Sequence, residues 1–142
     1  MAAAAAPVEV APGVHRVSVP LPVPPHEVAA WLREGEDGHT LVDTGMDTPG
    51  ARGALRRGAD LLGVTPASLR RVVLTHLHLD HCGLAEAVRD WSGAEVALHE
   101  AEEALVRRFV QGWPGERARA AAAFQAGGAS PAIAAALVAA TD

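Results

Sequence analysis

The sequence predicts an α/β fold, and two observations lead to that prediction. Short apolar runs rich in β-branched residues alternate with segments of helical spacing in the part of the chain before Glu100. Turn-forming residues separate these segments, as in GEDG at 35–38. The chain has 142 residues, of which 49% are hydrophobic and 20% charged, which suits one ordinary domain with a buried core.

Three strands are predicted near the N-terminus. Residues 1–12 are alanine-rich and are expected to be a ragged end. The stretch 13–22 alternates apolar and polar residues, as a half-buried strand does. Residues 28–34 and 39–43 flank a short polar turn, so they are expected to pair as a hairpin.

A helix is predicted next. Thr48 can cap its N-terminus, Pro49 suits its first turn, and Gly63 is placed to end it. A second Thr-Pro pair predicts a short helical turn within 65–71. The β-branched run at 71–75 then predicts a buried strand.

Helix and strand alternate once more before the character of the chain changes. Leu84, Val88 and Trp91 share one helical face, which predicts a helix over 84–91. The stretch 94–99 is the next predicted strand. This alternation is the pattern from which the α/β class follows.

The remainder, 100–142, is predicted to be helical. The first helix begins at Glu100 and is expected to break at GWPG, residues 112–115. A second helix follows this break, and Ser130 with Pro131 begins a third that runs to the chain end.

Charge and composition limit the class of protein. The net charge is −5 with histidine neutral, and the arginines are dispersed, so there is no strong nucleic-acid signal. Cys82 is the single cysteine, which excludes an intrachain disulfide. The N-terminus lacks the features of a secretory signal, and the apolar tail is too short to span a bilayer. We therefore expect a cytoplasmic protein without membrane contact.

The stretch THLHLDHCG, residues 75–83, carries the chemistry. It places three histidines and one aspartate within six positions, at His76, His78, Asp80 and His81. Neutral imidazole and carboxylate are good ligands for zinc and similar divalent ions. His76 and His78 are two residues apart in extended backbone and can hold one ion, whereas Asp80 and His81 can address a second.

These motifs resemble those of the metallo-β-lactamase fold superfamily. HLHLDH has the superfamily's HxHxDH form, and LVDTG, which contains Asp43, is similar to its first motif. The resemblance covers about residues 13 to 110 and implies an αββα sandwich with two zinc ions. Residues 13–99 would be the N-terminal half of that sandwich, and 100–142 a helical insertion at which the chain appears truncated.

The resemblance also assigns roles to individual residues. His76 and His78 would bind the first metal, and Asp80 and His81 the second, with Asp80 also orienting the attacking water. Asp43 would brace a ligand through a hydrogen bond. Thr75 could support the ligand loop, or it could be an ordinary strand residue.

The superfamily's later ligands have no counterpart in this sequence. No histidine or cysteine follows His99, and the only aspartate after it is Asp142. His99 is expected to be structural rather than a ligand, and Cys82 a half-buried thiol. The site would therefore need a missing C-terminal half or a partner chain.

The function expected from the resemblance is a metal-dependent hydrolase. A zinc-activated hydroxide would attack an ester, thioester or phosphodiester of a small-molecule substrate, with iron or manganese as other metals. One alternative is an iron-dependent oxidoreductase of the persulfide dioxygenase type. The other is a catalytically dead fragment or interaction module.

Overall fold

The computed structural model describes residues 5–128 and 130–139, and it divides the chain into two compact units. The first unit is Met1–Glu102 and the second is Glu103–Asp142. The first contains a mixed sheet with helices, and the second is helical. The α/β class predicted from the sequence is confirmed.

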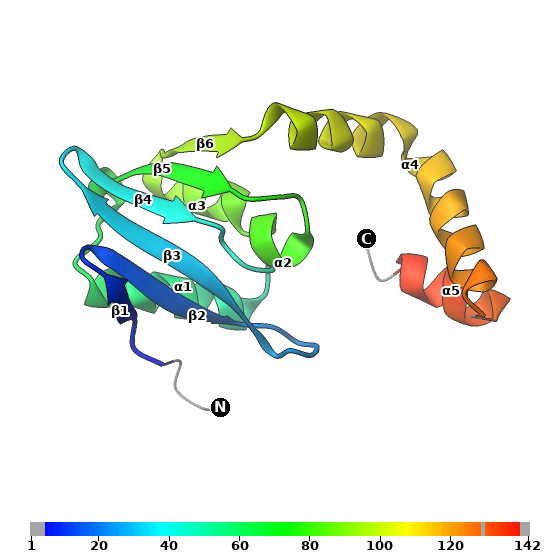
Figure 1. Cartoon of the computed structure of the whole chain (residues 1–142), viewed down its shortest axis with the longest axis horizontal. Coiled ribbons are helices and arrows are strands. Elements are labelled where there is room, and N and C mark those ends of the chain that lie inside the picture. The colour runs from blue at the N-terminus through cyan, green and yellow to red at the C-terminus, as the bar shows by residue number, and fades with distance from the viewer. Residues whose placement is uncertain (1–4, 129, 140–142) are drawn as a thin grey trace. The chain divides into compact units, whose positions relative to one another are not determined.

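The first unit is built on one six-stranded sheet whose strands follow one another in chain order (Figure 1). The strands are β1 (Val8–Ala11), β2 (Val14–Pro20), β3 (Glu27–Gly35), β4 (Gly38–Val42), β5 (Leu69–Leu74) and β6 (Glu95–Leu98). The first four strands pair antiparallel, whereas β4, β5 and β6 pair parallel. The parallel half thus brings the carboxyl ends of three strands to one edge of the sheet.

Strand β1 contradicts the expectation that residues 1–12 form a ragged end. It pairs with β2 through a two-residue turn at Pro12 and Gly13, where Gly13 has a φ of 69°. All four residues of β1 are exposed, so the strand depends on backbone pairing, and neither of its faces is buried. Pro-Gly between two β-branched runs was the usable signal.

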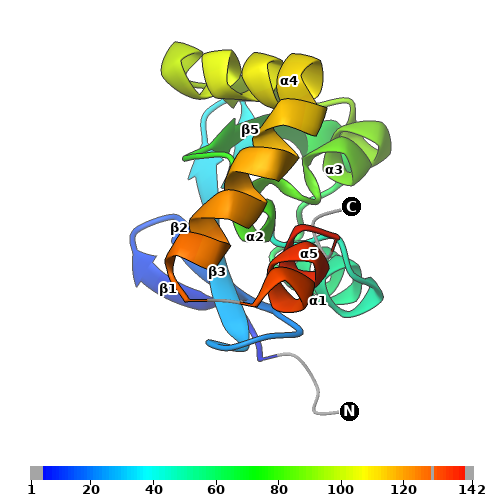
Figure 2. The ribbon, with the colours of Figure 1, turned by 90° about the vertical axis from the view of Figure 1, so that its right-hand side faces the viewer.

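Helices α1 (Pro49–Leu61) and α3 (Ala85–Ser92) lie on the same face of the sheet (Figures 1 and 2). The sheet side chains facing them are buried apolar residues. They include Val17, Val19, Ala30, Leu32, Leu41 and Val72. Contact between α1 and β2 is close, because a Cβ added at Gly58 would come within 2.6 Å of Cγ1 of Val17.

The predicted capping of α1 is confirmed. Its N-cap is Thr48, whose Oγ1 accepts a hydrogen bond from the backbone N–H of Ala51 at 3.1 Å. Gly63 follows the helix in the left-handed region, with a φ of 69°. The short turn predicted within 65–71 is the 3₁₀ helix η1 (Pro66–Ser68), closed by a capping box between Thr65 and Ser68.

The helical segment after β6 consists of α4 (Glu100–Ala126) and α5 (Pro131–Ala139). The predicted break at residues 112–115 is wrong, because α4 continues through them, and its ribbon changes direction partway along (Figure 1). Helix formation is cooperative, and a long run of good helix formers can carry a proline at the cost of a bend. Ser130 caps α5 as predicted, with Oγ 3.3 Å from the backbone N of Ile133. The end of the third predicted helix, residues 140–142, lies outside the described residues.

Within the described part of the chain, none of the helices combines the length and the apolar character needed to cross a membrane.

Candidate metal centre

The candidate centre forms where β4 and β5 end side by side. Val42 and Val73 are register partners, so Asp43 and Thr75 follow the two strands at the same edge. The backbone N–H of Asp43 donates to the carbonyl of Val73 at 2.9 Å, which continues the pairing by one residue. Crevices outside the carboxyl ends of parallel strands are the usual position of ligand sites in α/β proteins.

Asp43 is buried and conformationally strained. The residue is 4% exposed, and its φ of 57° lies in the left-handed region that residues other than glycine rarely adopt. Its carboxylate accepts hydrogen bonds from the N–H of Thr75 at 2.9 Å and the hydroxyl of Thr75 at 2.8 Å. It also lies 2.8 Å from Nδ1 of His81. Strain of this kind persists where the surrounding structure enforces it, typically at functional sites.

The two residues after Asp43 connect this strand end to the histidine loop. Thr44 is fully buried, and its Oγ1 donates to the carbonyl of His81 at 2.9 Å and accepts from the N–H of Leu84 at 3.2 Å. The N–H of Thr44 donates to the same His81 carbonyl at 2.7 Å. Gly45 has a φ of 97°, and a Cβ there would come within 2.5 Å of Val19, so only glycine fits.

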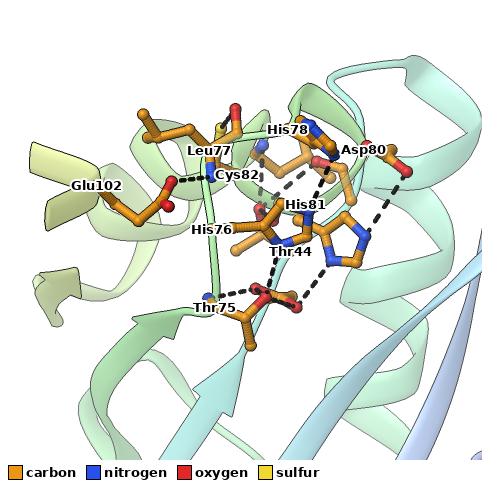
Figure 3. Close-up of polar contacts among 12 residues, drawn as sticks. Thr44, Thr75, His76, Leu77, His78, Asp80, His81, Cys82 and Glu102 are labelled. Atoms are coloured by element: carbon orange, nitrogen blue, oxygen red, sulfur yellow. Dashed lines mark hydrogen bonds and ion pairs between the residues drawn. The ribbon is translucent and has the colours of Figure 1, made fainter. Parts of the chain in front are cut away.

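The histidines of the cluster meet above this strand end (Figure 3). Nε2 of His76 lies 3.0 Å from Nδ1 of His78, and the ring centroids of His76 and His81 are 4.2 Å apart. His76 and His78 come from the irregular loop between β5 and the short helix α2 (Leu79–Cys82), whereas His81 lies on α2 itself. The structure therefore brings together the side chains that the sequence placed in the cluster.

The hydrogen-bond geometry is compatible with one set of neutral imidazole tautomers. Thr75 gives its hydroxyl proton to Asp43, so its oxygen can accept from Nδ1–H of His76 at 3.0 Å. Nε2 of His76 is then an acceptor and faces Nδ1–H of His78. In the neutral tautomer of His81 whose Nδ1–H donates to Asp43, Nε2 carries the lone pair. Asp43 thus orients His81 directly and His76 through Thr75.

Asp80 and His81 form the second donor pair. Oδ2 of Asp80 lies 3.6 Å from Nε2 of His81, and both side chains are partly exposed. Across residues 5–128 and 130–139, no three or more His, Cys, Asp or Glu side chains are arranged to hold one ion. The described residues therefore offer two pairs of donors and not a complete ligand set.

The donors present fit a zinc-like ion in chemistry and spacing. Two ligand nitrogens in a tetrahedral zinc site lie roughly 3.3 Å apart, given zinc–nitrogen distances of about 2.0–2.1 Å. The 3.0 Å between Nε2 of His76 and Nδ1 of His78 is close to that separation. Asp80 and His81 supply one carboxylate oxygen and one imidazole nitrogen, a common mixture for divalent metals.

Other chemically capable residues near the cluster have structural partners. His99 immediately precedes α4, and its Nδ1 accepts from the backbone N–H of Ala101 at 3.1 Å. Cys82 is half-buried, and its thiol lies 3.3 Å from the carbonyl of Leu77. Burial raises the pKa of the Cys82 thiol, and the nearby carboxylates of Asp43 and Asp80 add to that rise. Both residues thus have the kind of contact expected of structural groups.

Sequence reasoning missed two residues that shape this region. The sequence marks Thr44 only as part of the LVDTG motif, although its side chain joins the strand end to α2. Glu102 accepts a hydrogen bond from the backbone N–H of Leu77 at 3.1 Å (Figure 3). Nothing local in the sequence marks Glu102, because its partner lies 25 residues earlier in the chain.

The sequence model of the metallo-beta-lactamase superfamily matches residues 23–134 of this chain. The chain belongs to that superfamily, whose members usually bind metal ions. Among curated proteins, a probable metallo-hydrolase of Bacillus subtilis (strain 168), YqjP, is 36% identical over 74 residues, which cover 52% of this chain and 23% of that protein. An uncharacterized protein of Mycobacterium tuberculosis (strain ATCC 25618 / H37Rv) is 38% identical over 80 residues, covering 56% of this chain and 33% of that protein.

Solved structures show the same fold. The metallo-beta-lactamase family protein TTHA1429 from Thermus thermophilus has a TM-score of 0.65 and 38% identity, covering 71% of this chain and 33% of that chain. A beta-lactamase domain protein from Burkholderia ambifaria has a TM-score of 0.55 and 34% identity, covering 65% of this chain and 30% of that chain. This chain therefore spans 23–33% of the length of these relatives.

Proposed function

We propose that this chain supplies the HxHxDH side of the active site of a metal-dependent hydrolase. His76 and His78 would hold one zinc ion, and Asp80 and His81 would contribute to a second. The observation that carries the proposal is the convergence of two imidazole nitrogens to 3.0 Å beside an imidazole fixed by a buried carboxylate. The likeness to a probable metallo-hydrolase supports the same reaction class.

Zinc bound in such a site polarises a substrate oxygen and lowers the pKa of a coordinated water. The residues of this chain have separate tasks around it. Asp43 would accept a hydrogen bond from Nδ1–H of His81 and so leave Nε2 of His81 to face a metal. Asp80, next to that nitrogen and partly exposed, would orient the attacking water with its carboxylate. The substrate would be a small ester, thioester or phosphodiester.

The complete reaction needs ligands that these two pairs do not provide. Structural zinc sites use four protein ligands, and catalytic ones commonly use three. We propose that the remaining ligands come from further chain or from a partner chain, and the greater length of the relatives agrees with the first source. The 142-residue chain alone would bind zinc weakly and hydrolyse slowly.

Zinc titration of the 142-residue chain, followed by NMR of the imidazole nitrogens, tests the proposal. The signals of His76, His78 and His81 should shift together, whereas those of His26, which lies just before β3, should not. Replacing a residue that only hydrogen-bonds a metal ligand lowers metal affinity by about 10–100-fold. His76 is proposed as a ligand itself, so His76→Ala should lower the zinc affinity by at least about tenfold. His26→Ala is the control and should leave the affinity unchanged. Equal zinc affinity in wild type and His76→Ala would contradict the proposed site.

A further inference from the structure

The backbone of Leu77 is hydrogen-bonded at both its N–H and its carbonyl, although the residue lies in an irregular loop. Its N–H donates to Oε2 of Glu102 at 3.1 Å, and its carbonyl accepts from the thiol of Cys82 at 3.3 Å (Figure 3). Leu77 separates His76 from His78, so the orientation of this residue decides how the two imidazoles are directed. The loop follows the end of β5 and precedes α2, so neither element's own hydrogen bonds include this N–H.

Glu102 is itself held in place by the start of α4. Its backbone N–H donates to the carbonyl of His99 at 2.9 Å, and Nδ1 of His99 accepts from the backbone N–H of Ala101, the residue before Glu102. The side chain of Glu102 is half-buried, and its acceptor is a carboxylate. Hydrogen bonds to an ionised acceptor are stronger than neutral ones, so this contact can fix a short loop.

We propose that Glu102 is a positioning residue for the proposed metal ligands. By binding the N–H of Leu77, it holds the loop in the conformation that brings Nε2 of His76 within 3.0 Å of Nδ1 of His78. The thiol of Cys82 holds the next peptide, because it donates to the carbonyl of Leu77. The part of this inference that concerns zinc rests on the proposed function, whereas the part that concerns the loop does not.

Amide hydrogen exchange at Leu77 in the metal-free 142-residue chain tests the loop contact. Exchange should be slow in wild type and about tenfold or more faster in Glu102→Ala. Glu102→Gln keeps an acceptor oxygen at the same reach and should retain much of the protection. Glu102→Asp keeps the charge but is one methylene shorter, so it should also lose the protection of the Leu77 amide. It replaces Glu102→Ala in the test if the alanine variant does not fold.

The matched control is Glu103→Ala. Glu103 is the next residue of the same helical turn, is exposed, and pairs with Arg107, whose Nε lies 3.0 Å from its Oε1. Both glutamates lie near the N-terminus of α4, where a negative charge stabilises the helix through its dipole. Removing either charge should therefore weaken the helix to a similar extent, so Glu103→Ala controls for this loss. Leu77 exchange should be unchanged in Glu103→Ala. Fast exchange of Leu77 in wild type, or equal acceleration in both alanine variants, would overturn the proposal.

Two measurements test whether Glu102 positions the imidazoles of His76 and His78: their nitrogen chemical shifts without metal, and the zinc affinity. Without metal, the nitrogen shifts that report the His76–His78 hydrogen bond should change in Glu102→Ala and Glu102→Asp and remain in Glu102→Gln. With zinc, the affinity should follow the same order, falling about tenfold in the first two variants. If the Leu77 amide of wild type is protected but the protein binds no zinc, the proposed function is wrong. The nitrogen shifts of His76 and His78 without metal then test the positioning role of Glu102 by themselves. If Glu102→Gln loses zinc affinity with Leu77 still protected, Glu102 acts as a ligand and the positioning role is wrong.

Discussion

The carboxylate of Asp43 lies 2.8 Å from Nδ1 of His81, although the two residues are 38 positions apart in the chain. Asp43 follows β4, and His81 lies on α2 after the neighbouring strand β5. The contact therefore depends on the parallel pairing of β4 with β5. The same carboxylate binds both the N–H and the hydroxyl of Thr75, so three donors converge on one buried group.

Asp43→Asn should destabilise the fold by about 1–3 kcal/mol, because an amide turns one acceptor oxygen into a donor facing other donors. The backbone should tolerate the change, since asparagine also adopts the left-handed region at this φ of 57°. Urea unfolding measures the loss, and imidazole NMR should show that Nδ1 of His81 no longer keeps its proton. The control is Asp37→Asn in the exposed turn between β3 and β4, which should change stability by less than about 0.5 kcal/mol. Equal stability of the two variants would contradict this account.

The strands and helices between residues 39 and 99 and the histidine cluster could be predicted because both have local signals in the sequence. Thr48, Pro49 and Gly63 marked the ends of α1 through backbone chemistry that each residue carries alone. The ligand candidates lie within a few residues of one another, so no knowledge of the tertiary structure was needed to group them.

What escaped prediction depends on contacts between distant parts of the chain. Strand β1 is exposed on both faces and is held by pairing with β2, a contact between backbones that residues 8–11 do not reveal on their own. Thr44 and Glu102 act through backbone groups of residues 25 to 40 positions away. Proline and glycine at 112–115 predicted a break from intrinsic propensity, and the cooperativity of the surrounding helix outweighed it.

Thr44→Val should cost about 0.5–1.5 kcal/mol, the usual net value of a lost hydrogen bond. The loss should be modest because the partners of the hydroxyl have other bonds. The carbonyl of His81 also accepts from the N–H of Thr44, and the N–H of Leu84 also donates to Gly45 at 3.0 Å. Thr44→Ser keeps the hydroxyl and should recover the hydrogen-bond contribution. Thr40→Val in β4 is the control for exchanging a hydroxyl for a methyl group. If it lowers the free energy of unfolding as much as Thr44→Val does, the hydrogen bonds of the Thr44 hydroxyl are not the cause of the loss.

The pair of Glu27 and Arg16 gives the sheet a pH dependence. The Arg16 guanidinium hydrogen-bonds Glu27 at 2.7 Å and holds the pKa of that carboxyl below its usual value, and the hydroxyl of Ser18 lowers it further. A carboxyl with a lower pKa in the folded state stabilises the fold above its unfolded pKa of 4.5, and this contribution disappears as pH falls through the folded value. The difference in unfolding free energy between wild type and Glu27→Gln should therefore be larger at pH 7 than at pH 3. A difference independent of pH over that range would contradict the assignment.

Two glycines of α1 should respond to alanine in opposite directions. Gly53 is exposed, and a Cβ there would meet nothing within 4 Å, so Gly53→Ala should stabilise the protein by about 0.5–1 kcal/mol by reducing the freedom of the unfolded chain. Gly58 is buried against β2, where a Cβ would lie 2.6 Å from Cγ1 of Val17, so Gly58→Ala should cost about 1–3 kcal/mol through overpacking. Because both changes raise helix propensity equally, the difference between them measures the contact of α1 with the sheet.

Adding Val17→Ala to Gly58→Ala should relieve the clash, so the double variant should lose less stability than the sum of the two single losses. Thermal unfolding of the four variants checks the set, and stabilisation by Gly58→Ala would show that α1 does not pack on β2 at this distance.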